Sequence, residues 1–131
     1  MVALISLAVA VTSLGYNTWR NEVSEHNRNQ RLVAIELLLM LGDLQQLTLD
    51  KHYGSNIDAA AVLRQGWSQV LTIRDLAQIA EGSVPSSATY LYETWRSDNH
   101  LLGTNVAGKD RISTALESVR SDAHELLKSL D

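Results

Sequence analysis

Three histidines in this chain follow an aspartate at the same spacing, in the pattern Asp-x-His. The pairs are Asp50 with His52, Asp98 with His100 and Asp122 with His124. Carboxylate and imidazole groups together can bind a transition metal or transfer a proton. In a helix, residues two apart point about 200° away from each other, so none of the pairs can chelate one ion. The chain also lacks the Glu-x-x-His motif of carboxylate-bridged metal sites. We therefore expect surface histidines and no metal.

Other groups needed for catalysis are missing from the sequence. There is no cysteine, which excludes thiolate nucleophiles and cysteine-ligated zinc or iron–sulfur sites. The stretch Gly108-Lys109-Asp110 lacks the preceding strand and glycine of a phosphate-binding loop. Glu36, Asp43 and Asp50 lie seven apart, which predicts one solvent-facing line on a helix rather than paired catalytic acids. We expect no enzyme, no catalytic residue and no cofactor; an unrecognised metalloenzyme is the enzymatic alternative.

Aromatic residues suggest one possible ligand site. Trp67, Tyr92 and Trp95 fall on consecutive predicted helices and could line a binding groove. The alternative is core packing, because buried tryptophan and tyrosine commonly fill helical cores with their polar ends at the edge. Whether a small molecule binds there is left open by the sequence.

Composition limits the class of protein. The 131 residues correspond to a single domain, and the net charge of -4 argues against nucleic-acid binding, which requires a basic face. One proline and seven glycines in a chain rich in leucine and alanine favour long helices. The sequence therefore predicts an all-α fold.

Residues 1–19 form an apolar segment without charged side chains. Spanning a bilayer takes about 20 residues, with a lower limit near 17, so this segment is predicted to be a single transmembrane anchor. Small side chains at alternating spacings of three and four give it a face for close helix packing. That face consists of Ala3, Ser6, Ala10 and Ser13. The alternatives are a soluble or interfacial core helix and a cleaved signal peptide.

The residues that follow the apolar segment bear on its orientation. Tyr16 and Trp19 stand where an interfacial aromatic belt would lie. Arg20, Arg28 and Arg31 are the basic residues nearest the segment, and the positive-inside rule then puts the globular part in the cytoplasm, at the inner membrane. The alternative is that these arginines only solubilise the chain and the domain faces outward.

Residues 20–31 are almost wholly polar and contain no glycine or proline, which predicts a helical stalk; the alternative is a disordered linker. Residues 32–131 carry helical periodicity broken by short loops, which predicts an antiparallel, up-and-down four-helix bundle. The expected helices are 32–51, 57–80, 86–102 and 105–130. The run from Leu37 to Leu41 is apolar on more than one face, so we expect it to be well buried, with Gly42 marking a close helix approach.

Together these features predict a membrane-tethered helical bundle that acts through protein–protein interaction, as a scaffold or small accessory subunit. A protein partner or self-association is expected, and nucleic acid is not. This organisation resembles that of many small bacterial inner-membrane proteins, a resemblance that implies no functional residues. The alternative function is a sensory or ligand-binding bundle with a pocket near Trp67 and Trp95.

Overall fold

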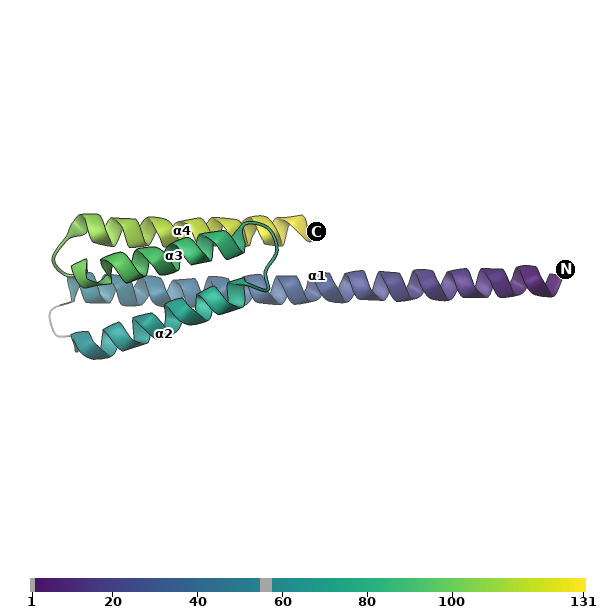
Figure 1. The fold of residues 1–131 in the computed structure, drawn as a ribbon, viewed down its shortest axis with the longest axis horizontal. Helices are drawn as coiled ribbons and strands as arrows, with labels where there is room; N and C mark the ends of the chain where they lie inside the picture. Colours follow the sequence, from purple (N-terminus) through teal and green to yellow (C-terminus); the bar gives the residue numbers. More distant parts are fainter. Residues whose placement is uncertain (1, 55–57) are drawn as a thin grey trace.

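The structure, a computed structural model, describes residues 2–54 and 58–131. Within these residues the chain forms four α-helices and one short 3-10 helix, with no strand (Figure 1). The bounds are α1 Val2–Tyr53, α2 Ala59–Ala77, α3 Val84–Asp98, η1 Asn99–Leu101 and α4 Val106–Ser129. The prediction of an all-α chain is therefore confirmed for the part of the chain that is described.

Helix α1 runs without interruption through the three segments predicted as anchor, stalk and first bundle helix. Residues 20–31 are helical because they contain no helix breaker and need no separate nucleation between two helical flanks. The helix ends at Tyr53, two residues beyond the predicted boundary. Gly54 follows, and its backbone N–H still donates to the Asp50 carbonyl at 2.7 Å.

Helix α2 is capped by a side chain at its start and is followed by a turn at its end. Its predicted first residue, Ile57, lies outside the described residues; the described N-cap is Asp58, whose carboxylate accepts from the Ala61 N–H at 3.2 Å. The helix ends at Ala77, earlier than the predicted residue 80. The turn that follows includes Gly82 at φ +72°, a left-handed conformation that favours glycine.

Helix α3 starts at Val84, two residues before the predicted position, with Pro85 in its first turn. It ends at Asp98 rather than at residue 102, because the chain tightens into η1 and then extends at Leu102 before Gly103. Gly103 has φ +95°. Helix α4 begins after Asn105, whose side chain accepts from the Gly108 N–H at 3.3 Å.

The helices pack around one apolar core. Helix α1 contacts α2 and α4, and α3 contacts the same two helices. Figure 1 shows the four helices side by side, with the turn between α2 and α3 and the connection between α3 and α4 at opposite ends of the core. The largest fully buried apolar side chains on α1, α2 and α4 are Leu37, Leu41, Leu44, Val70, Ile73, Ile112, Leu116 and Val119.

Candidate functional site

The first half of α1 lies outside the helical core. Every residue from 2 to 26 is exposed, and Figure 1 shows this bare segment projecting far beyond the other helices. Leu14 is 67% exposed and Trp19 60% exposed. The other large apolar residues of the bare segment that are exposed are Val2, Leu4, Ile5, Leu7, Val9, Val11, Tyr16 and Val23. Such a long apolar surface without a partner indicates an interaction site.

Helix α1 is long and apolar enough to cross a membrane, since it contains an 18-residue window with a mean hydropathy of 1.5. Of the residues in that window, 33% are buried. The buried residues of α1 all lie between Gln30 and Thr48, so a window with this share of buried residues lies in the half of α1 that packs in the core and not in the predicted anchor. Core helices of soluble proteins meet the same criterion of length and composition.

The small-residue face predicted for the anchor lies entirely on the bare segment. Ala3, Ser6, Ala10 and Ser13 are all exposed, and no other described helix covers them. The face is therefore free to approach another helix, whether in a membrane or in a complex.

The three predicted topology-setting arginines occupy different surroundings. Arg20 and Arg28 are exposed, and the Arg28 guanidinium lies 4.0 Å from the Glu25 carboxylate on the same helix. The Arg31 guanidinium lies 3.3 Å from the carboxylate of Asp131, at the other end of the chain. Arg20 and Arg28 are therefore exposed, whereas Arg31 is partly buried.

The packed half of α1 begins inside the predicted stalk. Gln30 is buried, its amide donates to the Ile79 carbonyl at 2.8 Å, and its amide oxygen accepts from the Glu81 N–H at 2.9 Å. One turn earlier, the exposed His26 ring contacts the Glu81 carboxylate. These bonds fasten the turn between α2 and α3 to α1, which the polar composition of the stalk did not predict.

The aromatic residues predicted for a groove are divided between core and surface. Trp95 has no exposed area, and its indole fills the space opposite Gly66, where any Cβ would collide with the ring. Trp67 and Tyr92 are partly buried beside it, edge to face with ring centres 6.1 Å apart. In this conformation a ligand could contact only those two rings, and the Arg74 guanidinium already covers Tyr92 at 4.4 Å.

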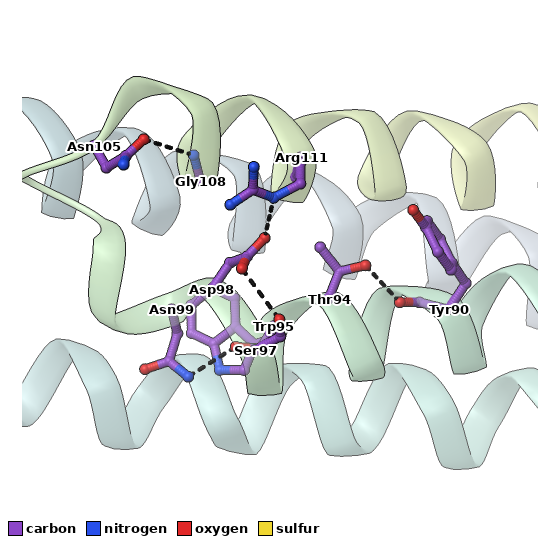
Figure 2. Close-up of polar contacts among 9 residues, drawn as sticks. All are labelled: Tyr90, Thr94, Trp95, Ser97, Asp98, Asn99, Asn105, Gly108 and Arg111. Carbon is purple, nitrogen blue, oxygen red and sulfur yellow. Dashed lines mark hydrogen bonds and ion pairs between the residues drawn. The ribbon is translucent and has the colours of Figure 1, made fainter.

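A polar cluster lies where α3 meets the start of α4 (Figure 2). The buried Asp98 carboxylate accepts from the Arg111 Nε at 2.6 Å and from the Ser97 hydroxyl at 3.1 Å. The hydrogen bond from Arg111 is the main reason that the pKa of Asp98 lies below its usual value, and burial opposes it. The Asn99 amide donates to the Trp95 carbonyl at 2.7 Å. The Asp98 carboxylate and the Asn99 amide are both paired, whereas the buried Trp95 Nε1 has no partner among the described residues. The cluster closes a helix end.

The same end of the core is tied to α1. The Lys51 ammonium donates to the Asn99 carbonyl at 3.1 Å, and burial lowers the pKa of Lys51. The Gly103 N–H donates to His52 Nδ1 at 2.9 Å. Within the described ranges, 2–54 and 58–131, no group of three or more histidine, aspartate or glutamate side chains could hold a metal ion.

The outer face of the packed half of α1 differs from what the sequence predicts. Leu32 is 60% exposed, Ile35 43% and Leu39 62%. A Cβ at Gly42 would have no atom of another described helix within 4 Å, so the close helix approach expected there does not occur among the described helices. We call these four residues the outer stripe. Leu39 lies on the opposite side of α1 from the helices that cover Leu37 and Leu41, which is why the expected burial of the whole run is wrong at Leu39.

A groove of 510 Å³ runs between α1 and α2. Five of its seven lining residues are polar, and the full set is Asp43, Gln46, Leu47, Asp50, Val62, Gln65 and Gln69. The amide oxygen of Gln69 is buried and accepts no hydrogen bond from the described residues. Carboxylates beside amide groups suit a cationic or hydrogen-bond-donating ligand.

Comparison with known proteins adds no relative. No family model, curated protein or solved structure matches the chain. The functional argument therefore depends on the surfaces described above.

Proposed function

We propose that this chain is a non-enzymatic, membrane-tethered helical bundle that acts through protein–protein interaction. The observation that carries the proposal is the bare segment, residues 2–26, whose apolar side chains are exposed along one uninterrupted helix. In water that surface would be costly, at about 25 cal/mol for each Å² of apolar area. A bilayer around residues 2–19 removes the cost.

The finer arrangement follows from the same geometry. With residues 2–19 in the bilayer, Tyr16 and Trp19 lie at the interface, and residues 32–131 form an antiparallel four-helix bundle beyond it. Connections at opposite ends of the core support the antiparallel order (Figure 1). The exposed Arg20 and Arg28 favour the cytoplasmic side of the inner membrane for the bundle.

An interaction role fits the remaining surface better than catalysis does. The Asp98 carboxylate is held by Arg111 as well as by the Ser97 hydroxyl, an arrangement that suits a structural role rather than a catalytic base. The apolar surface that remains exposed on α1, by contrast, is of the kind that partner proteins cover. A scaffold or small accessory subunit needs only such surfaces.

Alkaline extraction of membranes from cells that express the full chain tests the anchor. We expect the wild-type chain to stay with the lipid, and the double variant Leu7→Arg, Val11→Arg to be released, because each arginine costs about 2.5 to 3.5 kcal/mol at a helix centre. Ile79→Arg, at an exposed site on the bundle, is the matched control and should stay in the membrane. Release of the wild-type chain would overturn the anchor. A reporter fused to the C terminus tests on which side of the membrane the bundle lies.

The second candidate function is a sensory or ligand-binding bundle. The groove between α1 and α2 favours it, because Gln69 is one of its lining residues and the buried amide oxygen of Gln69 has no partner among the described residues. A thermal-shift screen of small cationic compounds should then yield a compound that raises the melting temperature. The shift should disappear in Gln69→Leu; loss in Trp67→Ala instead would place the pocket at the aromatic residues. No hit would count against a ligand.

A further inference from the structure

Helix α1 has two apolar faces in its packed half. One face is buried against α2 and α4, and its residues include Ala34, Leu37 and Leu41. At 100° per residue, the outer stripe lies on the opposite side of the helix. Its four members are Leu32, Ile35, Leu39 and Gly42, at spacings of three and four that match the seam of a coiled coil.

We propose that the outer stripe pairs with the outer stripe of a second copy of this chain, with the two α1 helices parallel and in register. The proposal rests on the proposed function for its direction, because two copies anchored in one membrane through the same segment must run the same way. A parallel pair places each residue of the stripe against its own counterpart. The interface is then the same patch on both chains, as twofold symmetry requires.

Charges on the two sides of the stripe fit this arrangement. Arg31 lies on one flank and Glu36, five residues further along, lies on the other. Flanking positions at this separation face each other across a parallel two-stranded coiled coil and set partner choice. Arg31 of each copy would therefore meet Glu36 of the other, giving two ion pairs around the apolar seam.

The remaining positions of the seam also suit a second helix. Gly42 has open space where a side chain would be, which allows two backbones to approach closely. On a straight helix, the small-residue face of the bare segment lies on about the same side as the outer stripe. The contact can thus continue from apolar side chains in water to small side chains in the bilayer, where close packing drives association.

Disulfide cross-linking tests the pairing directly, because the chain has no cysteine of its own. The full chain carrying only Leu32→Cys, or only Leu39→Cys, should form a disulfide-linked dimer in membranes under mild oxidation. Ile79→Cys, exposed but away from the stripe, should stay monomeric. Cross-linking of the Leu32→Cys chain only with the Leu39→Cys chain would show an antiparallel pair and overturn the proposal. No dimer from either, or a disulfide to a different protein, would also overturn it.

Exchanging the charges of Arg31 and Glu36 tests the proposed ion pairs beside the outer stripe. Arg31→Glu should weaken dimerisation of the detergent-solubilised chain measured by sedimentation, and adding Glu36→Arg should restore it. Both variants lose the contact with Asp131 equally, so restoration can come only from the partner helix. Leu39→Gln removes two buried leucines from the dimer and should raise the dissociation constant by on the order of a hundredfold. Unchanged dissociation in Leu39→Gln, or failure of the double variant to recover, would contradict the proposal.

Membrane extraction of the same variants separates the two proposals. A chain that stays in the membrane without cross-linking would overturn the dimer and leave the anchor intact. A chain that cross-links at Leu39→Cys but is released by alkali would overturn the anchor and leave the pairing intact.

Discussion

The two halves of α1 belong to one helix but have different surroundings. In the bare segment, residues 2–26, no side chain is buried. In the packed half, from Gln30 to Tyr53, one face is buried against α2 and α4, and part of the opposite face is apolar but uncovered. Both halves are rich in apolar residues, so hydropathy alone does not separate them.

The difference teaches that burial in this chain is decided by what the neighbouring helices can reach. Leu41 is fully buried and Leu39 is mostly exposed, although they lie two residues apart in the same apolar run. Residues two apart in a helix point to opposite sides, and α2 and α4 cover only one of those sides. The bare segment extends beyond all three other helices (Figure 1).

The largest expected effect is a contrast between equivalent truncations in the two halves. Leu41→Ala should destabilise the chain by about 2 to 5 kcal/mol, because it leaves a cavity in the core. Leu14→Ala should change the free energy of unfolding by less than about 0.5 kcal/mol, since Leu14 touches no other helix. Urea unfolding in mild detergent, followed by circular dichroism, measures both. Equal losses would mean that the bare segment is packed after all.

The boundary between the halves can be tested at Gln30. Gln30→Ala should cost about 1 to 3 kcal/mol, because the Ile79 carbonyl and the Glu81 N–H would lose their partner in a part-buried place. The neighbouring Asn29 is exposed, and Asn29→Ala is the matched control that should have little effect. The same unfolding measurement applies, and equal effects would move the boundary further along α1.

Acid should destabilise the end of the core where α3 meets α4, far from the bare segment of α1. The pKa of Asp98 is lowered in the folded state, so its contribution is complete above the unfolded value of about 3.9 and is lost as pH falls through the lower folded value. The stability difference between wild type and Asp98→Asn should therefore be constant from neutral pH down to about 4 and shrink below it. Urea unfolding at a series of pH values measures this difference, and a difference that stays constant below about pH 4 would contradict the prediction.

The smallest expected effect is at His26, where the bare segment ends. His26→Ala removes an exposed contact with Glu81 and should change stability by no more than about 1 kcal/mol. A larger loss would show that the core extends further toward the N terminus than Gln30. Thermal unfolding of wild type and variant side by side gives the comparison.

Much of the fold could be predicted from residue spacing. The inner faces of α2 and α4 follow a regular apolar period that can be read from the sequence, and Val70, Ile73 and Val119 lie on it and are buried. The predicted helix end at residue 51 and helix start at residue 105 lie within two residues of the observed bounds. Such features depend on local sequence, which is why they can be deduced without the neighbours.

Other features depend on contacts between distant residues and could not be predicted. Gln30 looked like any other polar residue of the stalk, and only the approach of the turn after α2 gives it a buried role. Trp95 was one candidate for a groove. Because Gly66 has no side chain, the Trp95 ring fits against it inside the core. The early end of α3 follows from Asn99 and the turn at Gly103, which local periodicity did not distinguish from a longer helix.

The unbroken course of α1 has a mechanical consequence. Ten helical residues between the proposed membrane interface at Trp19 and Gln30 span about 15 Å at 1.5 Å each. The bundle would stand off the lipid by that height, on a shaft without a glycine or proline hinge between residues 20 and 31. A tilt or rotation of the helix in the bilayer would then be transmitted to the core as a rigid motion, rather than being absorbed by a flexible joint.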